Sequence, residues 1–339
     1  MFDIITFGSA TQDIIVRPKK LTVLQYNAHE TSDKNIAEVC FPMGSKVEIE
    51  QIGFYSGGGG TNTAATFALQ GFSVSYWGMI GNDISGKEII TQLKSRKIDT
   101  SFIQTTDKKV TNHSIIISSE GTDRTILAYR GAAELLDKDI IPWKKLKAKW
   151  LYLAPLTGLL CDSFEELVDY AKDHGMQVAI NPSMAQLSMP MEQLKPIFAK
   201  VDVLFLNQEE ASFLTKIPME QEQEIFKAID ELCPGVAVMT KGGDGVVVSD
   251  GKYVYSAKPS PNRVVVDTLG AGDSFASGFL TDYIRENGNI EKAIQLGMAN
   301  SQACLSQIGA KNGLLKKGDP FDRVPVTKRE CDNNVCIVK

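Results

Sequence analysis

The segment from Val264 to Phe275, with the sequence VVVDTLGAGDSF, combines residue types that could bind and transfer a phosphoryl group. An apolar strand is expected to run through a glycine-rich turn into a helix that continues to Leu280. Backbone N–H groups at the start of a helix lack intrahelical acceptors and carry the positive end of its dipole, so they bind anions. Gly270, Ala271 and Gly272 would supply these groups, and the two glycines leave room for a phosphoryl oxygen.

Asp273 follows this turn directly and is the candidate catalytic base. Its carboxylate is placed to accept the proton of an attacking hydroxyl group. The helix dipole weakens the base because it favours the ionised form. The nucleophile loses its proton late in a loose phosphoryl-transfer transition state, however, so orientation matters more than base strength. The alternative, a carboxylate that only caps the helix, suits an isolated Gly-Asp turn better than the full string D-T-L-G-A-G-D.

Alternating strands and helices are expected to position this turn. Beyond Lys149, almost wholly apolar segments are separated by helix-like sequence, which indicates a parallel sheet covered by helices on both faces. The predicted strands are Trp150–Leu153, Gln177–Ile180, Asp202–Leu206 and Val236–Met239. Ligands bind such sheets beyond the carboxyl ends of the strands. The segments that follow those ends are therefore candidates for the site: Asn181–Ser183, Asn207–Glu210, Thr240–Gly245 and Asp267–Asp273.

The N-terminal part of the chain has a different pattern. Residues 3–8 and 13–16 are predicted strands, and residues from about 19 to 55 mix polar and apolar positions, as in strands with one face in water. Segments 112–118 and 124–129 are predicted to form a β-ribbon. We expect one α/β domain over residues 1–315, with a lid from about 17–55 and 110–130, and a loosely attached polar tail at 316–339.

Composition argues against several classes of protein. The formal net charge of −5 provides no overall positive field for nucleic acid or an anionic membrane, so neither is an expected partner. No run of about 18 apolar residues occurs, and no signal-peptide pattern follows Met1, so we expect a cytoplasmic protein. The six cysteines form no C-x-x-C pair and are expected to be reduced thiols.

The 267–273 segment resembles the second signature of the ribokinase-like carbohydrate kinase family, whose members phosphorylate sugars, sugar acids and nucleosides. Four further segments are similar to family motifs, in the family's order: Gly57–Asn62, Gly81–Gly86, Asn207–Glu210 and Thr240–Gly245. The resemblance covers about residues 1–315. It implies an α/β fold of the ribokinase-like, three-layer α/β/α type, with a mostly parallel central sheet and a small projecting β-sheet lid.

The resemblance also implies which residues bind the acceptor substrate: Asp13, Gly57, Gly58 and Asn62. A carboxylate and an amide can hold neighbouring hydroxyl groups, while glycines allow close approach of the main chain. Asn181 would lie near the same cleft and assist, although an Asn-Pro turn is an equally good reason for its presence.

The resemblance implies ATP as the phosphoryl donor and Mg²⁺ as its metal ion. Asn207 and Glu210 would organise Mg²⁺, largely through water. The residues implied to lie along the nucleotide are Thr240, Lys241, Gly243, Gly245 and Asn300. For Lys241 a solvated lysine is the competing interpretation. Asp267 and nearby carbonyls resemble the family's monovalent-cation site, which makes K⁺ a candidate.

The predicted function is phosphorylation of a hydroxymethyl group on a ribose-like or other neutral sugar, with a nucleoside kinase as the alternative. Gly59 and Gly60 stand where sugar-phosphate members of the family place a lysine, which weakens the case for a phosphorylated acceptor. A non-catalytic sensor of sugars or nucleotides is a remote alternative, since Asp273 and the glycine turn are retained. A dehydrogenase would need G-x-G-x-x-G after the first strand, and none occurs.

Apolar residues in the predicted lid allow two interpretations. Phe41, Ile52, Phe54 and Tyr55 could stack on a nucleobase, or they could form a contact between two copies of the chain. Small projecting sheets commonly need a partner to be stable. We therefore expect a homodimer formed through the lid.

Overall fold

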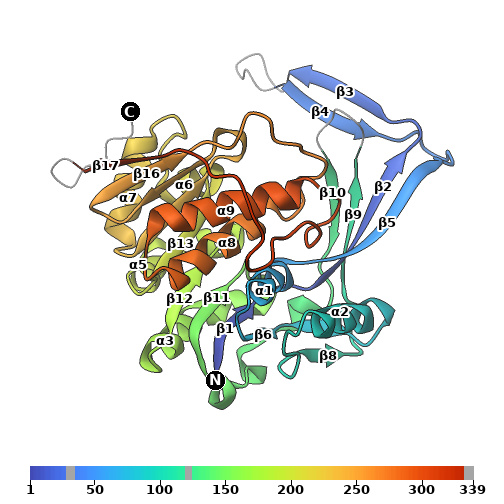
Figure 1. Cartoon of the computed structure of the whole chain (residues 1–339). Helices are drawn as coiled ribbons and strands as arrows, with labels where there is room; N and C mark the ends of the chain where they lie inside the picture. Colours follow the sequence, from blue (N-terminus) through green and yellow to red (C-terminus); the bar gives the residue numbers. More distant parts are fainter. Residues whose placement is uncertain (28–34, 119–123, 332–339) are drawn as a thin grey trace.

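The computed structural model describes residues 1–27, 35–118 and 124–331. Within these residues, nine strands form a central sheet in the order β17-β16-β15-β14-β13-β12-β11-β1-β6 (Figure 1). The strands from β14 to β6 run parallel, and β15, β16 and β17 are antiparallel. Their bounds are β1 Phe2–Phe7, β6 Val74–Trp77, β11 Ala148–Leu153, β12 Gln177–Ile180, β13 Val203–Asn207, β14 Val236–Thr240, β15 Val246–Ser249, β16 Tyr253–Ala257 and β17 Val326–Glu330.

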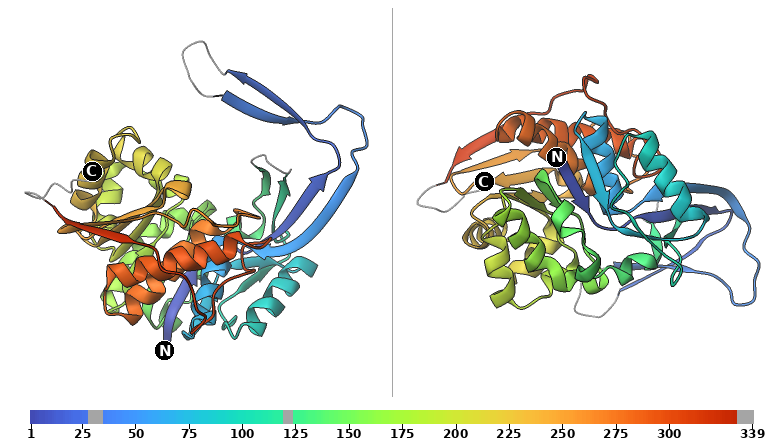
Figure 2. Two further views of the ribbon diagram at one scale, coloured as in Figure 1. Left: turned by 45° about the horizontal axis from the view of Figure 1, so that its top comes forward. Right: turned by 90° about the horizontal axis from the view of Figure 1, so that it is seen from below.

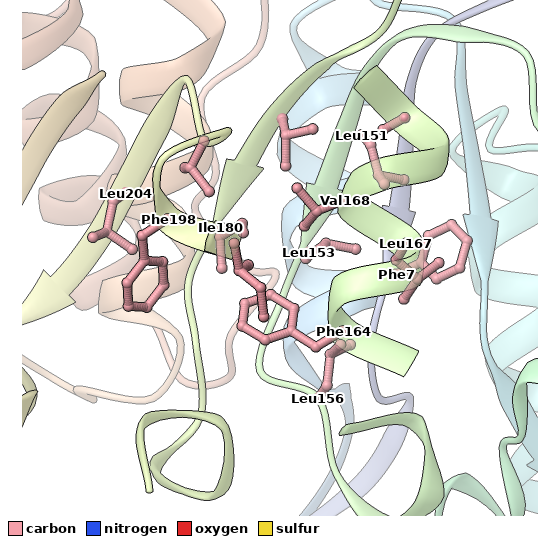
Figure 3. Packing of buried hydrophobic residues seen from close by; sticks show 14 of the residues in the cluster. Phe7, Leu151, Leu153, Leu156, Phe164, Leu167, Val168, Ile180, Phe198 and Leu204 are labelled. Atoms are coloured by element: carbon pink, nitrogen blue, oxygen red, sulfur yellow. The ribbon is translucent and has the colours of Figure 1, made fainter. Parts of the chain in front are cut away.

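Helices cover both faces of the sheet, which confirms the predicted three layers. Side chains alternate along each strand, so in β11 Leu151 and Leu153 enter one core, and Trp150 and Tyr152 enter the other. The first core packs against α3 (Phe164–Asp173), α4 (Met184–Leu187), α5 (Met191–Phe198), α6 (Gln208–Thr215) and α7 (Glu222–Leu232), as Figure 3 shows in part for α3 and Phe198. The second core packs against α1 (Gly59–Leu69), α2 (Ile84–Ser95), α8 (Ala271–Arg285) and α9 (Ile290–Leu305).

A smaller sheet projects from one side of the central sheet (Figure 1, Figure 2). Its order is β10-β9-β2-β5, and a separate hairpin of β3 and β4 extends the projection. Their bounds are β2 Thr11–Pro18, β3 Thr22–Asn27, β4 Asn35–Cys40, β5 Ile49–Gly57, β9 Asn112–Ile117 and β10 Thr125–Tyr129. The predicted lid therefore has a counterpart in the structure, although it begins at Thr11 instead of residue 17. A further pair, β7 (Met79–Gly81) and β8 (Gln104–Thr106), lies beside α2.

Two sequence-based expectations are wrong. Val264, Val265 and Val266 form no strand and are 60%, 49% and 53% exposed, because no strand pairs with them; the amides of Val266 and Asp267 instead reach Leu305 O at the end of α9. The tail was expected to be loosely attached from residue 316 onward, but residues up to 331 include a strand of the central sheet. Its β17 pairs with β16, and the Gln295 side chain exchanges two hydrogen bonds with the backbone of Val324.

The cysteines agree with the expectation in part. Cys40, Cys161, Cys233 and Cys304 carry free thiols, whereas Cys331 is disulfide-bonded. Cys336 lies outside the described residues. No helix among the described residues has the length and apolar character that crossing a membrane would require.

Candidate active site

The N-terminus of α8 lies where the anion cradle was predicted, but one of the three expected donors is not free, because the Ala271 N–H donates to Thr268 O at 3.4 Å. Gly270 precedes the helix with φ 76° and ψ 5°, and a Cβ there would lie 2.5 Å from Ala310 Cβ, so the turn requires glycine. No residue in the described part of the chain supplies an acceptor for the N–H groups of Gly272 and Asp273. A Cβ added at Gly272 would meet nothing within 4 Å. The two N–H groups are therefore available to an anion at the positive end of the helix dipole.

The Asp273 side chain does not cap its own helix. Its Oδ2 accepts a hydrogen bond of 2.8 Å from Asn62 Nδ2 on α1, 211 residues earlier in the sequence. Burial raises the pKa of Asp273, while the Asn62 hydrogen bond and the positive charge of Lys311 oppose this rise. The Asp273 carboxylate thus lies beside the free backbone amides, and the Asn62 side chain orients it. Such a placement suits a group that accepts a proton from a bound hydroxyl.

Asp13 on β2 is the second carboxylate of the site. It is 4% exposed, and burial raises its pKa to about 6, although the Ser114 hydroxyl and the charge of Lys311 lower it. A Cβ on Gly57 would lie 1.8 Å from Asp13 Oδ2, so the carboxylate fits only beside glycine. Gly58 has φ 96° and starts α1, which carries Asn62. The structure therefore brings Asp13, the glycines and Asn62 together with Asp273, as predicted.

Asn62 has a second polar atom at the site. Its Oδ1 is buried and accepts no hydrogen bond from any described residue. Buried polar atoms in proteins are rarely left without a partner. An oxygen of this kind beside Asp273 suits a ligand that donates a hydrogen bond, such as an alcohol.

Removal of the Asn62 hydrogen bond is expected to change the pH dependence of catalysis. The bond stabilises the ionised form of Asp273, so Asn62→Leu should raise the pKa of that carboxyl and move the acid limb of the kcat profile about one unit to higher pH. The matched control is Asn82→Leu, which removes an exposed hydrogen bond between Asn82 and Asp107. If the acid limbs of the kcat profiles coincided for Asn62→Leu and the wild type, this would contradict an ionised Asp273 stabilised by Asn62.

Lys311 is a site residue that the sequence analysis missed. It is 7% exposed, and its Nζ donates hydrogen bonds to Ser56 O at 2.8 Å and Ser56 Oγ at 2.9 Å. Its charge attracts both Asp13 and Asp273. A lysine within the mostly uncharged run QIGAKNGLL was the only available signal.

The predicted nucleotide-side loop follows β14. Thr240 ends this strand beside Asn207 at the end of β13, and Gly245 has φ 99° where a Cβ would lie 2.0 Å from Ala257 O. Gly243 is exposed, and its carbonyl accepts a hydrogen bond from Arg263. The loop adjoins a cavity of about 690 Å³.

Lys241 is neither a free nor a fully solvated cation. Its ammonium forms an ion pair with Glu222 on α7, and both side chains are mostly buried. Lys241 and Glu222 both line the 690 Å³ cavity. An ion pair with Glu222 reduces the charge that Lys241 can offer to a nucleotide.

Asn207 and Glu210 form a capping box at the start of α6. Asn207 Oδ1 accepts from the Glu210 amide, and Glu210 Oε2 accepts from the Asn207 amide, each at 2.8 Å. Burial raises the pKa of Glu210, with the neighbouring Glu209 adding to the rise. Among the residues that the structure describes, Glu210 forms no ion pair, so its carboxylate at the start of α6 fits an outer role toward a Mg²⁺ ion that phosphates would chiefly hold.

Asp267 connects two loops. Its Oδ1 accepts from the Leu269 amide at 3.0 Å and its Oδ2 from the Gly309 amide at 2.9 Å. An ionised carboxylate has about four acceptor sites, so each oxygen retains capacity for a cation. The two oxygens of Asp267 therefore fit a K⁺ site beside the loop that leads into α8.

Two predicted ligands have other partners. Asn300 is fully buried; its Nδ2 donates to Ser274 O and Thr66 Oγ1, and its Oδ1 accepts from the Leu315 amide. Its expected contact with the nucleotide is therefore corrected: Asn300 holds the first turn of α8 against α1 and α9. Asn181 directly follows β12, and its Nδ2 donates to Phe205 O, which leaves its oxygen for a ligand.

Loss of the Asn300 side chain is expected to lower stability. Asn300→Ala would remove the two hydrogen bonds that Nδ2 donates and would leave the Leu315 amide without its acceptor, so the free energy of unfolding should fall by roughly 2–4 kcal/mol in urea titrations. Gln302→Ala, on the same helix and without comparable bonds, should change it by less than about 0.5 kcal/mol. Equal midpoints for the two variants would show that the Asn300 bonds contribute nothing.

Comparison with known proteins identifies the family of this site. Residues 26–317 match the pfkB family of carbohydrate kinases. The chain belongs to this family. The kinase is 26% identical over 272 residues to ribokinase of Haemophilus influenzae, covering 76% of this chain and 83% of that protein. It is 27% identical over 277 residues to cytidine kinase of Thermococcus kodakarensis, covering 81% and 94% respectively.

A solved structure shares the fold of this kinase. Arabidopsis thaliana ribokinase complexed with ribose and ATP superimposes with a TM-score of 0.74 at 20% identity, covering 93% of this chain and 96% of that one. The predicted ribokinase-like fold is thus confirmed. This carbohydrate kinase is an enzyme that phosphorylates a sugar or a nucleoside.

Proposed function

We propose that the kinase transfers the γ-phosphoryl group of ATP to the hydroxymethyl group of a ribose-like or other neutral sugar. The observation that carries the proposal is the placement of Asp273, bonded to Asn62, beside the free amides of Gly272 and Asp273. A base and an anion cradle on one helix turn are the two parts that alcohol phosphorylation needs. The ATP-bound Arabidopsis ribokinase supports the choice of nucleotide.

In the proposed reaction, Asp273 accepts the proton of the sugar hydroxyl as its oxygen bonds to the γ-phosphorus. The bond from that phosphorus to the bridging oxygen breaks, and ADP leaves. The amides at the start of α8 stabilise the charge on the migrating group. Asp13 and Asn62 orient the acceptor. Glu210 would lie near a Mg²⁺ ion, which would neutralise the charge of the phosphates, and Asp267 would help to hold K⁺ near the start of α8.

The strand register of the lid favours a sugar over a nucleoside. Asp13 lies opposite Tyr55 on β5 and Ser114 on β9, so these three side chains share one face of the lid sheet. Most exposed apolar residues occupy the other face: Ile52, Phe54, Ile115, Leu127 and Tyr129. Ile15, Ile116 and Ile126 share the Asp13 face, but Asp13 and Ser114 provide polar groups there that suit the hydroxyl groups of a polyol.

The apolar lid face, defined by those five residues, supports the proposed homodimer. Its side chains point away from Asp13, so they are free to pack against a second copy without filling the acceptor site. Phe54 is 60% exposed, and burying such side chains is a main driving force of association. Sedimentation of Phe54→Glu should show monomers if this face forms the contact. We place the reaction in the cytoplasm, where ATP is supplied.

A coupled assay with ATP and Mg²⁺ tests the proposed function. Pentoses, hexoses, keto-sugar acids and ribonucleosides are screened as acceptors, with K⁺ and Na⁺ salts compared. One neutral sugar is expected to turn over with the highest kcat/KM. Turnover of ribonucleosides alone would replace the sugar by the nucleoside alternative, and absence of any turnover would favour a sensor.

A further inference from the structure

A second polar cavity lies beside β5, the strand that carries Tyr55 and Ser56. It has a volume of about 270 Å³ and lies between β5, the end of α2 and the loop at residues 309–312. Its lining includes Tyr55, Ser56, Gln92, Arg96, Lys311 and Asn312. Neither Asp13 nor Asp273 lines it. We call it the Arg96–Lys311 pocket.

Two cations face this pocket without a carboxylate partner. Neither Arg96 nor Lys311 forms an ion pair with any residue that the structure describes. Arg96 donates one long hydrogen bond, from Nη1 to Gln92 O at 3.3 Å, and Lys311 donates two bonds to Ser56. A guanidinium has five N–H donors and an ammonium three. Most of the donor capacity of Arg96, and one donor of Lys311, is therefore unused.

The charges of Asp13 and Asp273 compensate Lys311 only in part, because its pKa is still lowered, and the two cations repel each other. Burial lowers the pKa of Arg96, and burial together with the charge of Arg96 lowers the pKa of Lys311 to about 7. Buried charges in proteins are normally paired or bind ions. An anion between the two side chains would remove their repulsion and use their free donors.

We propose that the Arg96–Lys311 pocket binds a small oxyanion, a phosphate or carboxylate group. The guanidinium would hold two of its oxygens and the Lys311 ammonium a third; Asn312, whose Nδ2 donates to Ile308 O, also lines the pocket. The volume accommodates a phosphate group with bridging water. The anion is either free in solution or a substituent of a larger ligand, and the chemistry of recognition is the same for both.

Lys311 would connect this pocket to the acceptor site. The charged groups that act on its ammonium are Asp13 on β2, Asp273 on α8 and Arg96 at the end of α2. An anion in the pocket favours protonated Lys311, and a protonated Lys311 favours ionised Asp13 and Asp273. Binding of the anion and binding of the acceptor should therefore strengthen each other to the same degree.

Sulfate is the probe for the test, measured by titration calorimetry with Mg²⁺ and ADP present so that the sites for the α- and β-phosphates are occupied. Arg96→Gln removes the guanidinium at a half-buried position and is expected to raise the Kd for sulfate at least about tenfold. Lys94→Gln, an exposed cation on the same helix, is the matched control and should bind sulfate as the wild type does. Thermal midpoints without sulfate verify that both variants fold.

The pH dependence gives an independent measurement. Sulfate keeps its charge between about pH 5 and 9, so a change in its affinity reports on the protein. Wild-type affinity should fall as the pH rises through about 7, because Lys311 then loses its proton. In Lys311→Met the affinity should be lower throughout, and the decline near pH 7 should disappear.

Two further results decide the matter. A selenate-soaked crystal should show anomalous scattering in the pocket. Scattering only at the start of α8, or equal sulfate affinity in Arg96→Gln and Lys94→Gln, overturns the proposal.

Acceptor kinetics identify the source of the anion. A loss of kcat/KM in Arg96→Gln confined to anionic acceptors indicates a substituent, whereas sulfate binding without such a loss indicates a free anion. The calorimetric result holds even if the proposed sugar acceptor is wrong.

Discussion

Asp273→Asn is expected to lower kcat by about two to four orders of magnitude, with little change in the KM for ATP or the acceptor. The asparagine keeps the size of the side chain and can still accept the Asn62 hydrogen bond, so the geometry should persist. What it lacks is a carboxylate able to take the hydroxyl proton. Steady-state kinetics with the best acceptor from the screen provide the measurement.

The control for this substitution lies on the same helix. Asp282→Asn changes a carboxylate that pairs with Arg285, three residues further along the helix, and its kcat should match that of the wild type. If Asp273→Asn retained kcat within about threefold of the wild type, proton transfer to Asp273 would not be part of the rate-limiting chemistry. Calorimetric binding of ATP should be equal in both variants.

Asp13→Asn is expected to lower kcat/KM for the acceptor by about two to three orders of magnitude. A buried carboxylate beside Gly57 can accept hydrogen bonds from two hydroxyl groups, each contributing roughly 1.5–3 kcal/mol as a charged acceptor. An amide oxygen is a weaker acceptor, and the amide nitrogen would face hydroxyl groups as a donor. The loss should appear mainly in the KM for the acceptor, while the KM for ATP stays near its wild-type value.

The raised pKa of Asp13 adds a pH test of the same residue. Only the ionised carboxylate accepts from two hydroxyl groups, and its pKa lies at about 6. The wild-type KM for the acceptor should therefore rise as the pH falls through about 6. In Asp13→Asn this dependence should be absent. An acceptor KM that stays constant from pH 5 to 8 in the wild type would remove Asp13 from acceptor binding.

Local features of the site were predictable because short segments determine them. The turn at Gly270 needs a left-handed conformation, and the start of α6 needs the Asn207 and Glu210 side chains three residues apart. Apolar runs such as Trp150–Leu153 also identify strands buried on both faces. The parallel sheet, its helices and the glycine turns were therefore expected before any coordinates.

The two wrong predictions, a strand at Val264–Val266 and a loose tail after residue 315, both depend on contacts with distant segments of the chain. Val264–Val266 has strand-like composition, yet a strand also needs an unpaired neighbour, and β17 takes the edge beside β16 instead. The sequence of β17, with three charged residues, suggested a loose tail because its pairing partner lies far away in the chain, with Glu330 opposite Tyr253 and Val326 opposite Ala257. Composition describes a segment, whereas sheet membership depends on which edge is free.

The sequence by itself determined the class of enzyme and the glycine turn at the start of α8, since both depend on short motifs; the catalytic role of Asp273 is a prediction from the same motifs. Only the tertiary structure decided that Asn300 is an internal support, that Lys241 pairs with Glu222, and that Lys311 reaches Ser56 across 255 positions. The physical reason is that burial and charge pairing arise when distant segments meet. The sequence alone does not show whether a lysine will contact water, a carboxylate or a pocket that contains a second cation.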